Sequence, residues 1–301
     1  MKRKTISLAV GMALIVATIV AFVSYSTAHQ EVLRQLSDIS PGSVAELLLL
    51  YAAWFAALVL TVQASLRLCR TRVPMIENAL LNAYSTLVNF VVPGQGGIAV
   101  RGLYLKKHHG LAVRRYVLAT LLYYVCYVMI SALMMWAPSR PWWQTLSGVV
   151  ALGLAAVGAV RWYARRSKKP ELALTLNTST LGFLLLATIV QAMVQVAIYA
   201  VELHIVDPHI GFGQALSYTG VANFSLFVAL TPSGIGIRES FLLLSQQLHH
   251  IATTAVVAAS VIDRGMFVLF IAVLFIATLG LHAKRRLGIG AASYDVKGLK
   301  P

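Results

Sequence analysis

The sequence predicts an all-α polytopic membrane protein with about six transmembrane helices and two re-entrant hairpins in an inverted-topology repeat. Three observations lead to this fold class. Of the 301 residues, 58% are hydrophobic and only 12% are charged, against about 25% charged residues in a typical soluble domain. Several apolar runs approach or exceed the roughly 20 residues with which a helix spans a bilayer. Basic residues, which produce a net charge of +15, gather in short loops between these runs.

This composition excludes a water-soluble globule, and its high hydrophobicity excludes a disordered chain. In a soluble protein the positive charge would suggest nucleic-acid binding. Here it indicates cytoplasmic loops beside anionic lipid headgroups, so we expect no nucleic-acid partner.

The first half of the chain contains three expected spans and one interrupted segment. Residues 6–23 exceed the 7–15 apolar residues of a usual signal peptide, so we expect a retained helix, with cleavage near Ala28 as the alternative. Full spans are also expected over 43–66 and 116–136. Between them, the apolar run 75–92 stops at a break rich in Pro and Gly, and a short stretch from Ile98 to Lys107 follows.

The second half has the same order of elements. Full spans are expected over 146–162, 181–201 and 251–281. Between the last two, the apolar run 212–230 stops at a second break rich in Pro and Gly, and a short stretch over 237–248 follows. An Asn-Phe pair precedes each break.

The basic residues indicate how the interrupted segments enter the membrane. If both segments return to the side from which they came, 21 of the 25 Lys and Arg residues lie on the cytoplasmic side, together with both termini. If residues 75–92 crossed completely, four of these basic residues would lie outside, against the positive-inside rule. We therefore expect two re-entrant hairpins that enter from opposite sides.

Such an order of spans, repeated in the opposite orientation, is typical of secondary transporters. We expect one integral membrane domain over residues 1–283, with repeats at about 6–136 and 146–281. A short basic cytoplasmic tail over 284–301 follows.

Each break is expected to expose free backbone N–H groups at the start of a short half-helix, which lipid cannot satisfy. The positive end of the helix dipole attracts phosphate there. Arg101 and Arg238 lie in or near the first turns of these half-helices, and their planar guanidinium groups suit phosphate oxygens. We therefore expect an anion site made twice, once from each side. Its backbone would be formed by Pro93, Gly94, Gly96, Gly97, Pro232, Gly234 and Gly236.

The alternative for the first break is an ordinary Pro-Gly turn, with Arg101 as a loop cation. The second half carries a stronger signal, because four charged residues lie within apolar segments, where each costs roughly 2.5–3.5 kcal/mol. These are Arg238, Glu239, Asp263 and Arg264. Neighbours on a helix point about 100° apart, so we expect each to find its partner on another element. Asp263 with Arg238 and Arg264 with Glu239 are the candidate pairs.

Two interpretations of these charges remain open at this point. In the functional one, Arg238 meets an anionic group while Glu239 restrains it or titrates. In the structural one, an internal ion pair only fixes the hairpin, and Asp263 and Arg264 project above the membrane at the end of a long helix.

Several polar residues are weaker candidates. The amides of Asn89 and Asn223 would bridge the broken helices or contact the substrate. Gln191 and Gln195 stand four residues apart on one helix face, where they would line the cavity or join helices. No catalytic constellation, metal-ligand spacing or nucleotide motif is visible, so we expect a transporter rather than an enzyme, with no cofactor.

The two breaks resemble the signatures of a known family. Residues from Asn89 to Lys107 contain Pro-Gly-Gln-Gly-Gly followed by Arg and Leu-Tyr, and residues from Thr231 to Glu239 form a Pro-x-Gly-x-Gly-x-x-Glu stretch. Together they are similar to the lysylphosphatidylglycerol synthase transmembrane region, a flippase-like family. The resemblance implies a bacterial inner-membrane domain that moves lipids between leaflets. In bifunctional members a soluble aminoacyl transferase follows, and we expect none here because the chain ends at Pro301.

The expected function is therefore a lipid flippase for an anionic or aminoacylated phospholipid or a polyprenyl-phosphate lipid, located in the bacterial cytoplasmic membrane. Its partners would be membrane lipids and a separate lipid-modifying enzyme. The alternatives are a secondary transporter of a small anionic solute and a membrane subunit of a lipid-modifying transferase.

Overall fold

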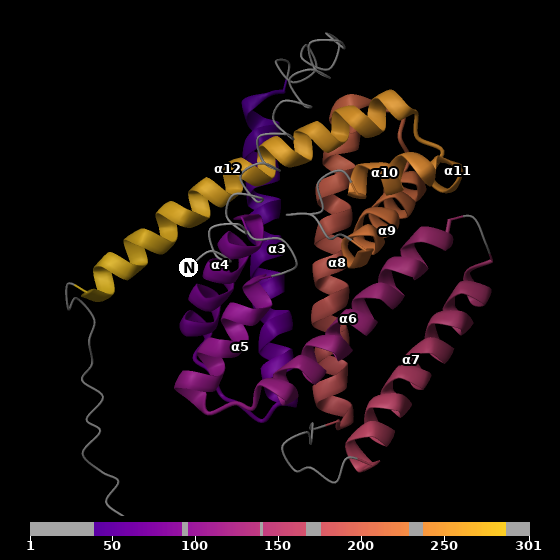
Figure 1. Cartoon of the computed structure of the whole chain (residues 1–301). Coiled ribbons are helices and arrows are strands. Elements are labelled where there is room, and N and C mark those ends of the chain that lie inside the picture. The colour runs from indigo at the N-terminus through magenta and orange to yellow at the C-terminus, as the bar shows by residue number, and fades with distance from the viewer. Residues whose placement is uncertain (1–38, 92–95, 139–140, 167–175, 229–236, 287–301) are drawn as a thin grey trace, which may run out of the picture.

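The computed structural model describes residues 39–91, 96–138, 141–166, 176–228 and 237–286, and this part of the chain is helical without strands (Figure 1). The expected first span, at 6–23, lies outside the described residues.

Among the described residues, four helices are long and apolar enough to cross a membrane: α3 (Pro41–Leu68), α6 (Val113–Trp136), α8 (Thr178–Val206) and α12 (Thr253–Arg286). They match the spans expected at 43–66, 116–136, 181–201 and 251–281. Large apolar side chains point outward from them, for example Leu49, Leu186 and Ile276, which are 72%, 60% and 68% exposed. Apolar surface of this extent requires lipid around it, so the protein is a helical membrane protein.

Local sequence explains where two of these helices begin. The hydroxyl of Ser40 accepts a hydrogen bond from the backbone N–H of Ser43 at 3.0 Å, and Pro41 occupies the first position of α3, as is common at helix N-termini. The side chain of Asn177 accepts from the N–H of Thr180 at 2.8 Å at the start of α8.

The remaining helices are shorter or less apolar. They are α4 (Met75–Val91), α5 (Gly96–His109), α7 (Trp142–Arg166), α9 (Phe212–Val228), α10 (Ile237–Leu244) and α11 (Gln246–His249). The expected span at 146–162 lies within α7, which is not one of the four helices named above. The stretch expected as one segment over 237–248 is divided at Ser245 into α10 and α11. The last helix continues to Arg286, past the expected domain boundary at 283.

The two longest central helices, α3 and α8, pack side by side, and the other elements are arranged around them in corresponding pairs (Figure 1). Helix α3 packs on α4 and α6 as α8 packs on α9 and α12. Helix α6 packs on α8 and α9 as α12 packs on α3 and α4. Each short helix pair therefore contacts a long helix of the other half.

The short pairs lie at opposite ends of the bundle. Helices α4 and α5 approach from the end where α3 finishes, and α9 and α10 approach from the end where α8 finishes (Figure 1).

Close approach of the helices depends on two glycines. A Cβ on Gly97 would lie 2.3 Å from the carbonyl oxygen of Ser85, so any side chain would push α5 away from α4. A Cβ on Gly220 would lie 2.5 Å from the backbone nitrogen of Met135 and 2.6 Å from the carbonyl oxygen of Ser131. Such contacts through small residues are typical of membrane helices, and here they join α9 to α6.

We expect the substitution Gly220→Ala to lower thermal stability in detergent by about 1–3 kcal/mol, because the new methyl group meets backbone that cannot move aside. The matched control is Gly182→Ala, since nothing lies within 4 Å of a Cβ at that position of α8. The control should leave stability unchanged or raise it, as Ala is the better helix former. Thermal unfolding followed by tryptophan fluorescence compares the two, and equal melting temperatures would contradict the close packing.

Candidate functional site

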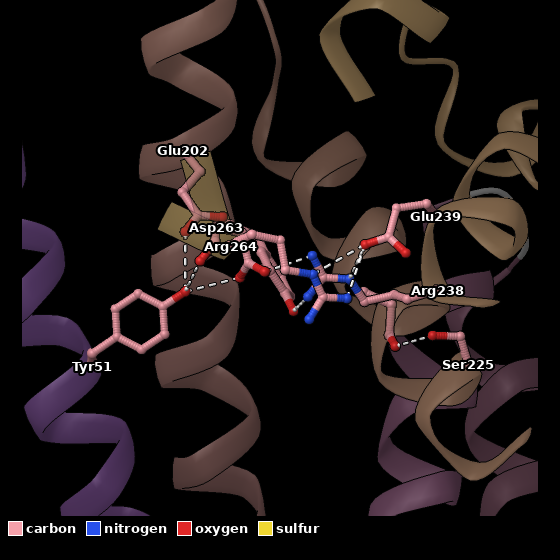
Figure 2. A network of polar contacts seen from close by, with 9 residues as sticks. Tyr51, Glu202, Ser225, Arg238, Glu239, Asp263 and Arg264 are labelled. Carbon is pink, nitrogen blue, oxygen red and sulfur yellow. Dashed lines mark hydrogen bonds and ion pairs between the residues drawn. The ribbon is translucent and has the colours of Figure 1, made fainter. Parts of the chain in front are cut away.

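A network of polar side chains lies where α3, α8, α10 and α12 meet (Figure 2). It contains Arg238 and Glu239 from the start of α10, and Asp263 and Arg264 from the first half of α12. It also contains Tyr51 from α3 and Glu202 from α8, which were not among the site residues predicted from the sequence. Except for Glu239 and Arg264, which are half-buried, these side chains are buried.

The central contact is the ion pair between Arg238 and Asp263. Nη2 of Arg238 donates to Oδ2 of Asp263 at 2.6 Å, and both side chains are less than a tenth exposed. Nη1 of Arg238 donates to the hydroxyl of Tyr199 at 3.2 Å. Because burial of a single charge is expensive unless it is paired, this contact is a condition for placing either residue inside the bundle.

A second ion pair lies beside the first. Nη2 and Nε of Arg264 donate to Oε1 of Glu239 at 2.9 and 3.2 Å. The same carboxylate oxygen lies 3.8 Å from Nε of Arg238, so the four charges form one neutral group. Both pairs expected from the sequence are present. The alternative in which Asp263 projects from the end of a long helix does not hold, because its side chain is buried and contacts Arg238 of α10 and Tyr51 of α3.

The acidic residue Glu202 approaches this group from α8. Its Oε1 lies 3.3 Å from the hydroxyl oxygen of Tyr51, which is also 2.9 Å from Oδ1 of Asp263. The sequence carried a signal for Glu202, because a carboxylate next to a long apolar run usually faces a bundle interior. The expected span ended at Val201, one residue too early to include it.

Arg101 lies in a different environment, on α5. Its Nη1 donates to Oδ1 of Asn82 at 2.6 Å, and its side chain is 8% exposed. Asn82 is held in turn by Asn78, which donates to Gln63 of α3 at 2.9 Å. Within the described ranges no carboxylate pairs with Arg101, and its buried Nε has no hydrogen-bond partner. Arg101 falls in the second turn of α5, which begins at Gly96, and not in the first.

The residues predicted for the two breaks differ in their contacts, and some of them lie outside the described residues. Oδ1 of Asn89 accepts from the backbone N–H of Gly97 at 2.7 Å, so this amide bridges α4 and α5 across the first break. Asn223 is fully buried in α9, and neither its nitrogen nor its oxygen has a partner among the described residues. Gly96 belongs to the first turn of α5. Pro93, Gly94, Pro232, Gly234 and Gly236 lie outside the described residues.

The far ends of α4 and α5 are tied together by Glu77, whose Oε1 accepts from the hydroxyl of Tyr104 and contacts Nε2 of His109, both at 2.8 Å. Partial burial raises the pKa of this carboxyl, but the two hydrogen bonds and the charge of His109 lower it more, so the net pKa lies below its usual value. This contact closes the open end of the first hairpin and so helps to position Arg101.

Two other glutamines connect helices. Oε1 of Gln191 accepts from Thr61 of α3 at 3.0 Å, and Oε1 of Gln195 accepts from Tyr127 of α6 at 2.5 Å. Both glutamines therefore join helices, which is one of the two roles predicted for them. In the described part of the chain, no three His, Cys, Asp or Glu residues gather closely enough to hold a metal ion.

We expect the substitution Arg238→Met to destabilise the protein by about 3–5 kcal/mol, because it leaves the buried carboxylate of Asp263 without its cation. The matched control is Arg264→Met in the half-buried pair, which should cost about 1 kcal/mol or less. Thermal unfolding in the same detergent measures both. A loss for Arg238→Met no greater than for the control would contradict the central role of the buried pair.

Comparison with known proteins identifies the family. The family described as the lysylphosphatidylglycerol synthase TM region matches residues 6–277, which contain both breaks and all the site residues described above. No curated protein matches the sequence. A match over most of the chain, together with the apolar helices, links the protein to lipid metabolism at a membrane. The chain belongs to the lysylphosphatidylglycerol synthase TM region family.

Proposed function

We propose that the protein is a lipid flippase of the bacterial cytoplasmic membrane and not an enzyme. Its substrate would be an anionic or aminoacylated phospholipid or a polyprenyl-phosphate lipid, with the headgroup phosphate held inside the helix bundle. The observation that carries this proposal is Arg101, a buried cation for which the described residues supply no anion.

A buried guanidinium group is stable only with a charge partner or a full set of hydrogen bonds. Asn82 satisfies one donor of Arg101, while Nε has none. A phosphate would accept two parallel hydrogen bonds from such a group and neutralise it. Arg238 differs, because Asp263 already neutralises it. The anion would therefore bind first at Arg101.

The arrangement of helices supports alternating access. The corresponding contacts of α3 with α8, and of each short pair with the opposite long helix, agree with an inverted repeat in which α4–α5 and α9–α10 are re-entrant. Counting residues 6–23 and α7, the chain would cross the membrane six times, with both termini in the cytoplasm. This orientation satisfies the positive-inside rule.

Release of Arg238 from Asp263 would give the second half the same free cation that Arg101 provides in the first half. A headgroup could then pass from one arginine to the other while the acyl chains stay in the bilayer. A concentration gradient of the lipid or an ion gradient would drive the movement. A separate lipid-modifying enzyme would supply the lipid if it is aminoacylated.

The proposal is tested in proteoliposomes that contain phosphatidylglycerol with a fluorescent acyl chain. We expect wild-type protein to transfer the label between leaflets faster than empty vesicles do. Arg101→Gln should slow the transfer about 10- to 100-fold, because a hydrogen bond to a charged group contributes about 1.5–3 kcal/mol. The matched control is Lys106→Gln, which removes the same charge from an exposed position of α5 and should keep the wild-type rate. Equal rates for protein-containing and empty vesicles would refute lipid transfer.

The chemistry of Arg101 would also suit a free phosphate, so transport of a small anionic solute is the second candidate. The same vesicles decide between the two when they are loaded with labelled inorganic phosphate. Phosphate movement without lipid movement would favour the solute transporter.

A further inference from the structure

Two buried carboxyl groups share one hydroxyl group at the centre of the network (Figure 2). The hydroxyl oxygen of Tyr51 lies 2.9 Å from Oδ1 of Asp263 and 3.3 Å from Oε1 of Glu202. The side chains of Tyr51, Glu202 and Asp263 are 4%, 1% and 6% exposed, so water does not separate them from one another.

The hydrogen bonds among Tyr51, Asp263 and Glu202 depend on how many protons these three groups share. A tyrosine hydroxyl has one hydrogen to donate and can also accept. The shorter contact gives that hydrogen to Asp263, which Arg238 keeps ionised from the other side at 2.6 Å. If Glu202 were also ionised, its Oε1 would face the lone pairs of the Tyr51 oxygen. A protonated Glu202 instead donates to that oxygen.

The second oxygen of Glu202 supports the same conclusion. Oε2 is buried and has no hydrogen-bond partner among the described residues. An ionised carboxylate is far more expensive to bury without partners than a neutral carboxylic acid.

The charges around Glu202 leave no cation for it. The groups that interact with it are Tyr51 from α3, Asp263 and Arg264 from α12, Arg238 from α10, Tyr218 from α9 and Tyr199 from α8 itself. Both cations are already paired, one with Asp263 and one with Glu239. An ionised Glu202 would give the buried group a net negative charge, and a protonated one keeps it neutral.

We propose that Glu202, Tyr51 and Asp263 form a proton-binding site in which Glu202 holds a proton at neutral pH, and that this site couples proton binding to the release of Arg238. When Arg238 moves to an anion, the carboxylate of Asp263 loses its cation. The Tyr51 hydroxyl then passes its proton to Asp263 while Glu202 passes its own proton to Tyr51. Glu202 regains a proton from solution, so one proton is taken up for each anion bound at Arg238. The coupling rests on the proposed function, whereas the protonation of Glu202 does not.

The protonation is tested without any transport, by infrared difference spectroscopy of the purified protein. We expect the wild type at neutral pH to show the C=O stretch of a buried carboxylic acid. This band should disappear in Glu202→Gln. The matched control Glu46→Gln, at an exposed carboxylate of α3, should keep it. Tyr51→Phe should keep the band but shift it toward that of an acid without a hydrogen bond.

Absence of the band in the wild type, or its survival in Glu202→Gln, would overturn the proposal. An unshifted band in Tyr51→Phe would refute the hydrogen bond between Glu202 and the Tyr51 hydroxyl. This second test does not depend on the Glu202→Gln variant.

The coupling is tested in the lipid-transfer vesicles with a pH difference of one unit across the membrane. One proton per anion allows a change in rate of up to about tenfold, since one pH unit corresponds to about 1.36 kcal/mol. The ratio of rates with and without the gradient should be severalfold for wild type and Glu46→Gln, and close to one for Glu202→Gln. A wild-type ratio close to one, with lipid still moving, would refute the coupling. Absence of lipid movement would refute the flippase function and the coupling that rests on it, while the infrared result would stand.

Discussion

The ion pair between Arg238 and Asp263 is the contact on which the second half of the molecule depends. Helix α10 has only eight residues, too few to be stable alone in water or at the edge of a bundle. The buried pair attaches this short helix to α12, and the other oxygen of Asp263 accepts from Tyr51 of α3. Through Tyr51 the network reaches Glu202 of α8. A single carboxylate thus connects four helices, because each of its oxygens needs a donor where water is absent.

The two halves place similar arginines in opposite electrostatic states. Arg238 is neutralised by Asp263, whereas no carboxylate of the described residues pairs with Arg101. A ligand can shift a protein between two conformations only if it interacts differently with them. In the proposed mechanism, the anion replaces Asp263 as the partner of one arginine, and the proton site on Glu202 and Tyr51 keeps the bundle neutral during that exchange.

Contacts between helices hold the helices that carry Arg101 and Arg238 in position, and they involve other side chains than these arginines. Gly97 lets α5 approach α4 closely enough for Asn89 to bridge the break, and Gly220 lets α9 lie against α6. Aromatic side chains extend the contacts between halves: Phe90 at the end of α4 packs on Phe267 of α12, and Phe227 at the end of α9 packs on Tyr124 of α6. The ends of α4 and α9 therefore each contact a long helix from the other half of the chain.

Apolar runs and basic loops were enough to predict the four long helices, because lipid requires about 20 apolar residues and a closed backbone. The sequence also offered Asp263 and Glu239 as candidate partners of Arg238 and Arg264, because a charge within an apolar segment needs a partner, and both pairs are present. Neither Tyr51 nor the role of Glu202 could be derived in this way, since they meet Asp263 from helices that are 212 and 61 positions away along the chain. Tertiary packing also decided that Arg101 has Asn82 as its partner and no carboxylate among the described residues, because a charge pair depends on distance in space and not on residue type.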